Sequence, residues 1–471
     1  MLKRLVILGS GESGTGAALL GKAKGFDVFV SDSGAIKDVY KQELDAQGIA
    51  WEENGHTLDL ILNADEIIKS PGIPEKTALM QAVRAKGINV IGEIEFGYRY
   101  AGKCSIVAIT GSNGKTTTTE LTYHLLKTAG LNVYKGGNVG NSFARLVLEH
   151  SALDPQPSSH IPPILILHPS PLIPQPSTLI PHPSPLIYVL EVSSFQLDDI
   201  QQFRPKISML LNITPDHLDR YEYQLDNYVR SKFRVAMNQS RGDLCIINGN
   251  DPIIKDYLTA NPRAIKCKKQ AVRKSELKNG YVRVGLNYRF DVASTNLKGP
   301  HNLFNAACAI RAALALGAEP GLIEEGLYSF NTPPHRLERV AEIDGVTWIN
   351  DSKATNVDSV FYALQAVDTP IVWIVGGQDK GNDYTPLLKL VKKNVKAIVC
   401  MGVDNAKIIK VFGKMNIPIA ETKSATEAVR TAAALADDGD TVLLSPACAS
   451  FDLFKNYEDR GTQFKQAVSE L

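Results

Sequence analysis

The sequence predicts an α/β protein with mainly parallel sheets. Strand-like apolar runs alternate with helical patterns along the chain, and most of those runs are continuous rather than alternating. Continuous apolar runs are typical of strands that are buried on both faces, as in a parallel sheet covered by helices. A third observation is the length, because 471 residues suffice for about two to four domains.

The apolar runs place the individual elements. The clearest expected strands are Leu5–Leu8, Val28–Ser31, Ile106–Thr110, Ile187–Glu191, Ile207–Asn212, Ile371–Val375, Ala397–Met401 and Thr441–Leu444. Helical patterns lie between them, for example over Ala306–Leu316 and Ala425–Leu435. Strands that alternate with helices indicate βαβ units.

We expect three domains, with boundaries at residues 1–98, 99–332 and 333–471. The last begins after Asn331-Thr-Pro-Pro334, a typical linker composition. The central block is interrupted at about 151–186, where Pro155–Pro185 holds eleven prolines. Because proline removes amide donors and is excluded from helix interiors and central strands, this stretch predicts a disordered, Pro-rich insertion.

Composition excludes several classes of function. The chain has 51 basic and 50 acidic residues and a formal net charge of +1, which predicts no binding of nucleic acid or anionic membranes. Apolar runs are too short for a membrane span of about 18 residues or more, so we expect no membrane insertion. The six cysteines are scattered without C-x-x-C, which argues against disulfides or zinc and favours the cytoplasm.

The N-terminal block opens with a strand and the turn Gly9-Ser-Gly-Glu-Ser-Gly14. Asp32 ends the next strand, 18 residues after Gly14. This order is a dinucleotide-binding fingerprint and predicts a Rossmann-like domain. Taken literally it indicates NAD, although the Glu12 carboxylate inside the turn is unfavourable beside a diphosphate.

The most informative stretch is Ser105–Thr119, in which a strand ends in a Gly-rich turn and Lys115 and Thr116 open a helix. The backbone N–H groups of such a turn bind phosphate oxygens, the lysine reaches the β- and γ-phosphates, and the threonine hydroxyl ligates Mg²⁺. The first glycine of the G-x-x-x-x-G-K-[ST] pattern is replaced here by Ile109. The sequence predicts a P-loop and a triphosphate site in the central domain.

Polar residues follow two further strand-like runs. Glu191 ends one run, and His217 follows another. Ligands of open α/β sheets bind beyond the carboxyl ends of strands, so Glu191 is a candidate ligand of Mg²⁺, although on its own it also fits a solvated strand end. A lone histidine is more often structural. Lys232 lies on an expected helix among other charges, a pattern that indicates a solvated lysine.

Four more residues carry polar groups of interest. Asn302 and Asn305 share one face at the start of a helix, where they suit either hydrogen bonding to an adenine edge or capping of the helix. Arg336 suits a bidentate clamp on a phosphate. Cys448 has no base beside it in the sequence and is interpreted as structural.

Taken together, the chain resembles the Mur ligase family. The resemblance covers nearly the whole chain except about 150–186 and rests on an ordered set of motifs: Thr110-Gly-Ser-Asn-Gly-Lys-Thr116, Gly137-Asn-Val-Gly140, Glu191-Val-Ser-Ser-Phe-Gln-Leu197, Asn212-Ile-Thr-Pro-Asp-His-Leu-Asp-Arg-Tyr221, His301-Asn-x-x-Asn305, Asn350-Asp-Ser-Lys-Ala-Thr-Asn356 and Ser445-Pro-Ala-Cys-Ala-Ser-Phe-Asp452. The resemblance implies a P-loop ATPase-like central domain between two Rossmann-like domains.

The resemblance also implies roles for individual residues. ATP would be bound by Gly111, Ser112, Asn113, Gly114, Lys115, Thr116, Thr117, Asn302, Arg336 and Asp351. Lys115, Glu191, His217 and Lys232 would be the catalytic residues. Two Mg²⁺ ions are expected, held by Thr116, Glu191, His217 and Lys232, the last as a carbamate.

The remaining implied residues bind the two other substrates. A UDP-linked substrate would contact Gly11, Ser13, Gly14, Asp32, Ser33, Ser70, Gly72 and Asn138. D-glutamate would contact Thr355, Lys380, Ser450 and Tyr457, the last of which is phenylalanine in the family pattern. The arginine that often follows the family's Asp-Thr pair near the uracil is Gly34 in this chain.

The implied activity is ATP-dependent addition of D-glutamate to UDP-N-acetylmuramoyl-L-alanine through an acyl phosphate, by a cytoplasmic monomer that serves peptidoglycan synthesis. Three alternatives remain open at this stage. Another amide ligase of the same architecture, such as a folylpolyglutamate synthase, would share the P-loop. An NAD-dependent oxidoreductase is supported only by Gly9–Asp32. A non-catalytic ATP-binding switch would not need the implied amino-acid site.

Overall fold

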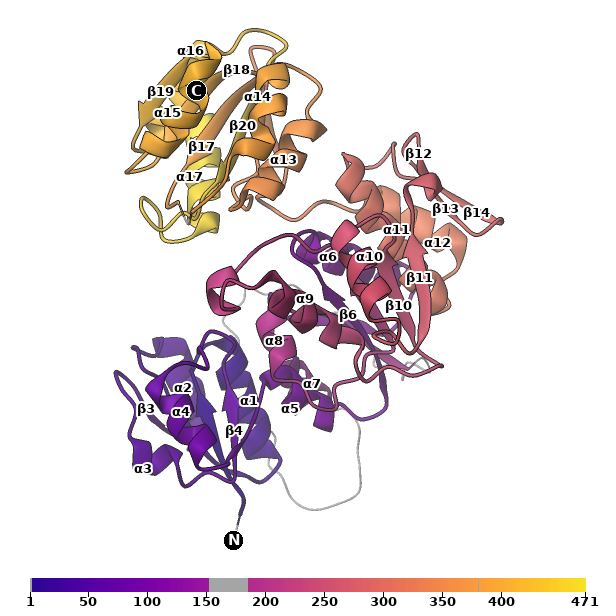
Figure 1. The fold of residues 1–471 in the computed structure, drawn as a ribbon, viewed down its shortest axis with the longest axis vertical. Coiled ribbons are helices and arrows are strands. Elements are labelled where there is room, and N and C mark those ends of the chain that lie inside the picture. The colour runs from indigo at the N-terminus through magenta and orange to yellow at the C-terminus, as the bar shows by residue number, and fades with distance from the viewer. Residues whose placement is uncertain (1, 152–184, 380) are drawn as a thin grey trace.

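The computed structural model describes residues 2–151, 185–379 and 381–471, and it arranges them as three α/β domains that follow one another along the chain (Figure 1). The prediction of α/β domains with mainly parallel sheets is confirmed. The expected Pro-rich insertion lies outside the described residues, apart from its ends at Ser151 and at 185–186. The domain boundaries at 98/99 and 332/333 remain predictions.

The N-terminal domain is built on a parallel sheet of the order β3-β2-β1-β4-β5. Its strands are β1 (Arg4–Leu8), β2 (Asp27–Ser31), β3 (Ala50–Glu52), β4 (Glu66–Lys69) and β5 (Asn89–Ile91). Its helices are α1 (Glu12–Ala23), α2 (Asp38–Ala46), α3 (Leu58–Ile61), α4 (Ala78–Ala85) and α5 (Glu93–Tyr100). The apolar run at Leu5–Leu8 is fully buried because helices cover both faces of the sheet. This is the predicted Rossmann-like arrangement.

The central domain has a parallel sheet of the order β11-β10-β9-β6-β8-β7. Its strands are β6 (Cys104–Thr110), β7 (Val133–Gly137), β8 (Leu186–Glu191), β9 (Ile207–Leu210), β10 (Leu244–Asn248) and β11 (Lys268–Val272). Its helices are α6 (Lys115–Thr128), α7 (Phe143–Ser151), α8 (Ser194–Asp198), α9 (Leu225–Phe233), α10 (Pro252–Ala260), α11 (Pro300–Ala315) and α12 (Pro320–Ser329). Because β6 lies between β8 and β9, the segments that follow these three strands meet at one edge of the sheet.

A small antiparallel sheet of β12 (Leu277–Lys278), β13 (Tyr281–Val284) and β14 (Tyr288–Asp291) is attached to the central domain. None of the strands expected from the sequence falls in this region. Asn279 and Gly280 connect β12 to β13 with φ angles of 52° and 75°. An Asn-Gly pair with two positive φ angles is the preferred two-residue hairpin turn, so the sequence carried a signal for this hairpin.

The C-terminal domain has a sheet of the order β15-β16-β20-β17-β18-β19. Its strands are β15 (Glu338–Ile343), β16 (Val346–Asn350), β17 (Ile371–Gly376), β18 (Val395–Met401), β19 (Ile419–Thr422) and β20 (Thr441–Ala447). Only β15 runs antiparallel to its neighbour. The helices are α13 (Val357–Ala366), α14 (Leu388–Asn394), α15 (Ala406–Phe412), α16 (Ala425–Leu435) and α17 (Tyr457–Ser469).

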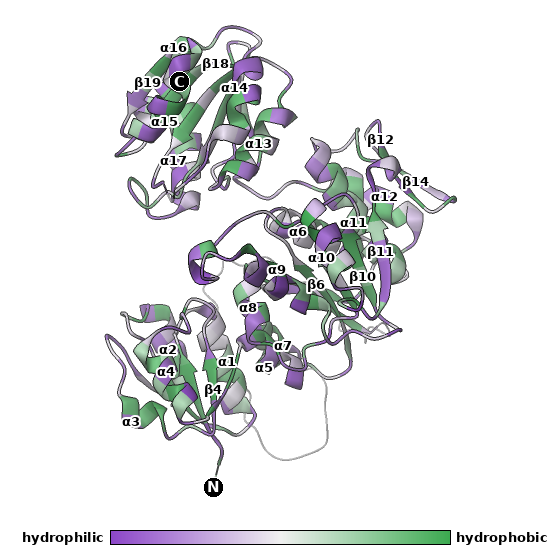
Figure 2. Ribbon diagram, viewed as in Figure 1, coloured by the Kyte–Doolittle hydropathy of each residue, from purple (hydrophilic) through white to green (hydrophobic). Residues whose placement is uncertain are grey.

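Hydropathy follows this architecture, because the inner strands of the three large sheets are buried and hydrophobic, whereas the edge strands β11 and β15 are more polar (Figure 2). Short 3₁₀ helices complete the fold: η1 (Leu218–Arg220), η2 (Arg234–Ala236), η3 (Lys274–Glu276), η4 (Thr385–Leu387) and η5 (Gly413–Met415). Within the described residues, no helix is both long enough and apolar enough to span a membrane.

Ion pairs join the N-terminal and central domains. Arg145 on α7 is almost buried, and its guanidinium donates to Glu12 at 2.8 Å and to Glu43 at 2.8 Å. Glu12 also accepts from the Ser142 backbone N–H at 3.0 Å. The Glu12 side chain is therefore engaged by the central domain, which removes the conflict that its place in the Gly-rich turn suggested.

Glu93 on α5 lies at the same interface. One carboxyl oxygen accepts the Ala144 N–H at 2.5 Å, and the other is buried without a hydrogen-bond partner. Burial, with a smaller contribution from Glu12, raises the pKa of Glu93 from 4.5 to about 8. The folded state therefore keeps this proton at pH values where the unfolded chain has released it.

The raised pKa predicts how stability depends on pH. The contribution of Glu93 to the free energy of unfolding is fully present below about pH 4.5 and is lost as pH rises through about 8. Between these pH values the free energy of unfolding falls by up to about 1.4 kcal/mol per pH unit. Glu93→Gln cannot ionise, so its melting temperature should exceed that of the unmodified protein at pH 8 by more than at pH 5. Thermal melts at both pH values measure this, with the exposed Glu324→Gln as control. An equal difference at pH 5 and pH 8 would contradict the prediction.

Candidate functional site

The P-loop joins β6 to α6 and requires glycine at two positions. Gly114 has φ +85°, and a Cβ there would lie 2.7 Å from Oδ1 of Asn305. Gly111 has φ +156°, and its Cβ would lie 3.0 Å from the Leu211 side chain. Ile109, which replaces the first glycine of the general pattern, is a buried residue of β6. The replaced position thus belongs to the strand and not to the phosphate-binding turn.

Asn212, which follows β9, fixes the loop. Its side-chain oxygen accepts the Asn113 N–H at 2.8 Å, and its amide nitrogen donates to the Asn113 carbonyl at 2.9 Å. The Ser112 hydroxyl donates to the Thr214 carbonyl at 2.9 Å. These bonds hold the turn in one conformation, as a preorganised anion site requires.

Two lysines converge on the same carbonyl of the P-loop. Nζ of Lys115 donates to the Gly111 and Ser112 carbonyls at 2.9 Å each, and Nζ of Lys232 donates to the Gly111 carbonyl at 2.9 Å. Burial lowers the pKa of both amines, and the Lys115 charge lowers that of Lys232 further.

The interpretation of Lys232 as a solvated lysine is wrong. Its side chain is 1% exposed, and Nζ lies 4.7 Å from the ring centroid of Tyr228. Tyr228 and Val229 precede it by four and three residues on α9 and are buried, so the three side chains share the face of the helix that packs inward.

Glu191 ends β8 beside the P-loop and is 2% exposed. Oε1 accepts the side-chain amide of Asn138 at 2.9 Å, whereas Oε2 is buried without a hydrogen-bond partner. The alternative of a solvated strand-end glutamate is wrong. A buried carboxylate oxygen without a donor fits a hard cation such as Mg²⁺.

The other expected Mg²⁺ ligands are less tightly arranged. The His217 ring is half exposed, and Nε2 lies 3.6 Å from a carboxylate oxygen of Asp216. The Thr116 hydroxyl accepts from Nη2 of Arg336 at 3.1 Å. Within the described ranges, no group of three or more His, Cys, Asp or Glu side chains is arranged to hold a metal.

The C-terminal domain supplies cations and polar groups to the P-loop. Besides Arg336, Nζ of Lys353 lies 3.5 Å from the Thr116 hydroxyl. Burial, followed by the Arg336 charge, lowers the pKa of Lys353 to about 8. Asn356 and Ser359 donate to the side-chain oxygen of Asn113 at 3.4 and 3.1 Å. Lys353 was not among the predicted site residues, although it stands in the Asn350–Asn356 motif.

Asp351 follows β16 and is 7% exposed. Its two oxygens accept from the Leu337 N–H at 3.2 Å and from the Ser445 hydroxyl at 2.8 Å. Burial raises the pKa of Asp351 to about 7. The bond to Leu337 fixes the loop that carries Arg336 next to it.

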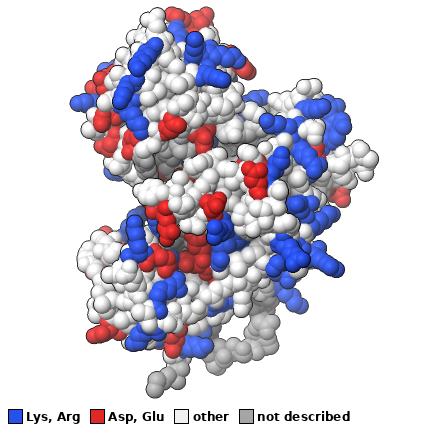
Figure 3. Space-filling view, viewed as in Figure 1, with Lys and Arg blue, Asp and Glu red and all other residues white. Residues whose placement is uncertain are grey.

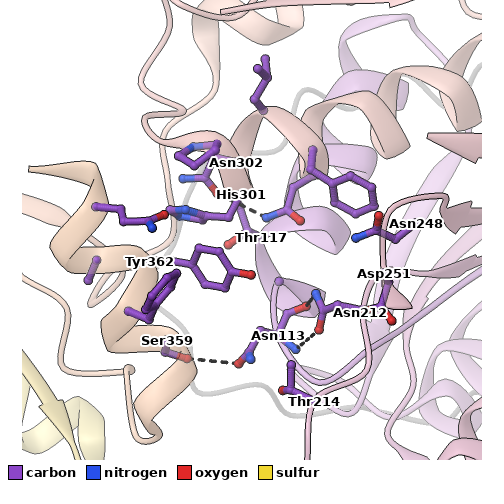
Figure 4. Close-up of a pocket in the computed structure, with 18 of the residues that line it drawn as sticks. Asn113, Thr117, Asn212, Thr214, Asn248, Asp251, His301, Asn302, Ser359 and Tyr362 are labelled. Atoms are coloured by element: carbon purple, nitrogen blue, oxygen red, sulfur yellow. Dashed lines mark hydrogen bonds between the residues drawn. The ribbon is translucent and has the colours of Figure 1, made fainter. Parts of the chain in front are cut away.

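A cavity of about 840 Å³ adjoins the P-loop between the central and C-terminal domains (Figure 4). Asn302 and Asn305 of α11 line it and bond to each other at 3.3 Å. Asn302 also donates to the Lys298 carbonyl, but α11 begins after Gly299 without a side-chain cap, so the helix-capping interpretation is wrong. Phe361 and Tyr362 of α13 line the cavity from the C-terminal domain, and the ring of Tyr362 lies 5.5 Å from that of His301. Phe304 of α11 adds aromatic surface from the central domain. These walls suit a planar, partly apolar base next to a phosphate site.

The predicted N-terminal residues lie around the carboxyl ends of β1, β2 and β4. The Asp32 carboxylate accepts the N–H groups of Ser10 at 2.6 Å and Gly34 at 2.9 Å. Gly11 precedes α1, and Gly14 packs so closely on the Gly9 carbonyl that no side chain fits there. Ser70 also lies against Gly9. The other residues predicted for this site are partly buried Ser13, exposed Ser33, and Gly72 in the turn after β4.

Arg220 joins this region to the central domain. Its guanidinium donates to the Gly72 carbonyl at 3.0 Å and to the Pro71 carbonyl at 3.1 Å. It also lies 4.6 Å from the ring centroid of Phe195, whose ring is 5.1 Å from that of His217. Asn138, which is predicted to contact the same substrate, is in the central domain and donates to Glu191, so its role stays a prediction.

Of the residues predicted to bind D-glutamate, Thr355 is exposed, Ser450 is buried, and Lys380 lies outside the described residues. Nζ of Lys353 lies 4.9 Å from the ring centroid of Tyr457. This contact joins the start of α17 to the P-loop through one lysine. Cys448 is buried with Sγ 3.2 Å from the Tyr384 hydroxyl, and burial raises the pKa of the thiol, so its environment is that of a structural cysteine.

Three family models match successive parts of the chain. Residues 3–92 match the model described as Mur ligase MurD-like, N-terminal domain, and residues 109–313 match the Mur ligase middle domain. Residues 335–448 match the Mur ligase, glutamate ligase domain. The N-terminal match favours the Mur ligase interpretation of the Gly9–Asp32 fingerprint over the NAD interpretation.

Curated relatives match from end to end. The chain is 46% identical to the UDP-N-acetylmuramoylalanine--D-glutamate ligase of Christiangramia forsetii, with 100% of each chain covered. It is 45% identical to the protein of that name from Bacteroides fragilis, again with 100% coverage of both, and 37% identical to that of Salinibacter ruber, with 99% and 98% coverage.

Solved structures share the fold. The UDP-N-acetylmuramate-alanine ligase of Thermotoga maritima superposes with a TM-score of 0.58 at 17% identity, covering 100% of both chains. A pseudomurein peptide ligase type C from Methanothermus fervidus gives 0.57 at 20% identity, covering 99% of both. With a P-loop in the predicted position and relatives matched over their full length, the chain belongs to the Mur ligase family.

Proposed function

We propose that this chain is an ATP-dependent ligase that joins D-glutamate to UDP-N-acetylmuramoyl-L-alanine in peptidoglycan precursor synthesis and releases ADP and phosphate. The observation that carries the proposal is the end-to-end identity of 46% with a relative named for this reaction. The site geometry supports it, because the C-terminal domain contacts the P-loop through Arg336 and the N-terminal domain contacts the central domain through Arg220.

The nucleotide is proposed to bind with its base in the 840 Å³ cavity and its phosphates on the P-loop. Gly111 and Gly114 with their positive φ angles, the α6 N-terminus and Lys115 form a site for phosphate oxygens. Arg336 and Lys353 add two cations from the C-terminal domain. Such a clamp suits a triphosphate whose terminal phosphoryl group is transferred.

Mg²⁺ is proposed to be held by Glu191 and Thr116, with His217 as a further ligand. The buried, unpartnered Oε2 of Glu191 supports this, since a carboxylate oxygen without a donor is costly unless a cation neutralises it. When bound, Mg²⁺ would neutralise charge on the phosphates.

Lys232 is proposed to carry a carbamate. The ammonium groups of Lys115 and Lys232 would repel each other, because both donate to the Gly111 carbonyl. Burial also favours the neutral amine at Lys232. A neutral amine adds to CO₂ and loses a proton, which places an anion beside Lys115 in place of a second cation.

The chemistry then needs little covalent participation by the protein. A carboxylate oxygen of the alanyl group attacks the γ-phosphorus, the bond from that phosphorus to the β–γ bridging oxygen breaks, and ADP leaves an acyl phosphate. The D-glutamate amine attacks the acyl carbon and loses a proton, and the C–O bond breaks to release phosphate. Lys115, Arg336 and the α6 N-terminus would stabilise the charge on the transferred group. Domain closure would exclude water from the acyl phosphate.

The two other substrates are assigned to the outer domains. The UDP moiety is proposed to lie on Gly11, Ser13, Asp32 and the Ser70–Gly72 turn, at the carboxyl ends of the N-terminal strands. D-glutamate is proposed to lie on Thr355, Lys380, Ser450 and Tyr457. We further propose that the enzyme acts as a monomer in the cytoplasm.

The assignment of the UDP-linked substrate to the Ser70–Gly72 turn predicts the effect of Arg220→Lys. Lysine replaces the planar guanidinium, whose Nη1 and Nη2 each donate to one carbonyl, by a single nitrogen, and it loses the contact of the guanidinium with the Phe195 ring, so the turn loses part of its support from the central domain. We expect the KM for the UDP-linked substrate to rise about tenfold, the effect of about one hydrogen bond, and the KM for ATP to stay unchanged. Steady-state kinetics measure this, with the exposed Arg230→Lys as control. A rise in the KM for ATP alone would contradict the assignment.

The proposed function is tested by phosphate release from purified protein. Release should require ATP, Mg²⁺, UDP-N-acetylmuramoyl-L-alanine and D-glutamate together, and omission of any one should abolish it. Phosphate release with L-glutamate in place of D-glutamate would indicate another amide ligase. Reduction of added NAD would indicate an oxidoreductase. Equal release without D-glutamate would show a plain ATPase and overturn the proposal.

A further inference from the structure

A second cavity, of about 430 Å³, lies in the central domain at the amino ends of β9, β10 and β11. We call it the basic cavity; its lining includes Lys206, Arg241, Asp243, Lys268 and Arg311. The strands of this sheet are parallel, and the P-loop follows the carboxyl end of β6. The basic cavity is therefore at the opposite edge of the sheet from the proposed nucleotide site.

Arg311 supplies the strongest observation. The residue is only 6% exposed, its Nη2 donates to Glu276 at 2.9 Å, and its Nε is buried without a hydrogen-bond partner. A buried guanidinium N–H that makes no bond costs free energy, and the cost is removed when an acceptor binds. Arg311 lines the cavity, so its buried positive charge is close to any anion that binds there.

The charge around the cavity favours an anion. Lys206, Arg241, Lys268 and Arg311 carry four positive charges, whereas Asp243 in the lining and Glu276, which pairs with Arg311, carry two negative charges, so the balance is positive. Asp243 is already paired with Arg204 at 2.8 Å and with Lys206 at 3.6 Å. The C-terminal end of α11 lies at the cavity and carries a partial negative charge, which disfavours an anion. That partial charge is only about half an elementary charge, so the cations outweigh it.

This concentration of cations is local. The chain as a whole has a formal net charge of +1. Lysine and arginine side chains nevertheless gather on the outer side of the central domain, over β10 to β14 (Figure 3). A balanced chain with one basic hollow is typical of an anion site rather than of a generally basic surface.

We propose that the basic cavity binds a small phosphorylated molecule through a phosphate dianion. Arginine and lysine are the side chains that recognise phosphate, and arginine does so with paired N–H groups. The volume suits a small ligand rather than a polymer. The site is distinct from the ATP cavity, because Asn302 and Asn305 at the start of α11 line that cavity and Arg311 near its end lines this one.

The first test is a tungstate soak of crystals grown without phosphate or sulfate, because tungstate has the shape and charge of phosphate and is located by its anomalous signal. We expect a peak in the basic cavity within hydrogen-bond distance of Arg311. The peak should disappear in Arg311→Gln and persist in Lys115→Ala and in Arg289→Gln, which removes an exposed arginine outside the cavity. No peak in the cavity of the unmodified protein would overturn the proposal.

The second test is calorimetric titration of Lys115→Ala protein with inorganic phosphate and with pyrophosphate, so that the P-loop contributes little. Adding Arg311→Gln, or the exposed Lys268→Gln if Arg311→Gln does not fold, should weaken binding at least tenfold. Unchanged affinity for phosphate and pyrophosphate after this substitution would show that they do not bind in the basic cavity and would overturn the proposal. Binding of anionic vesicles without binding of either soluble anion would assign the cavity to a membrane surface and would also overturn the proposal. Neither test depends on whether D-glutamate is the substrate.

Discussion

Lys115→Ala should abolish measurable turnover while leaving the fold intact. Nζ of Lys115 is held by two carbonyls of the P-loop, at the point where the transferred phosphoryl group is proposed to lie. Loss of a preorganised charge at such a point costs about 10²- to 10³-fold in rate, and more where phosphoryl transfer depends on it. Phosphate release with all four components measures the loss.

A matched control lies on the same helix. Lys127 is exposed near the end of α6, so Lys127→Ala removes the same charge far from the P-loop and should keep normal turnover. Circular dichroism and the melting temperature of both variants show whether the fold is kept. Turnover of well-folded Lys115→Ala within tenfold of normal would disprove the assigned role.

Replacement of Lys232 should have the second largest effect. Lys232→Arg keeps a cation but forms no carbamate, so its kcat should fall by about two to three orders of magnitude, the size expected when one electrostatic partner is lost. The unmodified enzyme should lose activity when CO₂ and bicarbonate are removed and regain it when bicarbonate is added.

Two variants distinguish a carbamate on Lys232 from an unmodified, buried Lys232. Lys127→Arg should respond to bicarbonate as the unmodified enzyme does, and Lys232→Arg should not respond. Full activity of the unmodified enzyme in CO₂-free buffer would leave Lys232 as a hydrogen-bond donor to Gly111 and remove the carbamate from the account.

The sequence predicts the parts of the site that depend on local pattern. The P-loop is such a part, because a buried strand, two glycines with positive φ and a lysine at the helix start are adjacent in the chain. Glu191 is another, because the end of an apolar run locates the carboxyl end of a strand. Both positions follow from short-range rules.

Contacts between distant segments could not be predicted in this way. Lys353 reaches Thr116 across 237 residues, and Arg145 reaches Glu12 across 133. Nothing in the sequence spacing of these residues indicates that they meet. The unpartnered Nε of Arg311 likewise emerges only from packing around α11.

The burial of Lys232 is an intermediate case. The neighbouring Arg230 and Arg234 suggest a charged, solvated helix face. Tyr228 and Val229, four and three residues earlier, place Lys232 on the apolar face instead. The spacing of three and four residues therefore indicates from the sequence alone that Lys232 is on the buried face of the helix.

The central claim is that the substrate's own carboxylate takes the γ-phosphoryl group of ATP before the amide forms. It is tested most directly with UDP-N-acetylmuramoyl-L-alanine labelled with ¹⁸O in its terminal carboxylate, by mass spectrometry of the phosphate released. The account predicts that each phosphate carries one oxygen from the carboxylate. Amide product accompanied by phosphate without the label would contradict it.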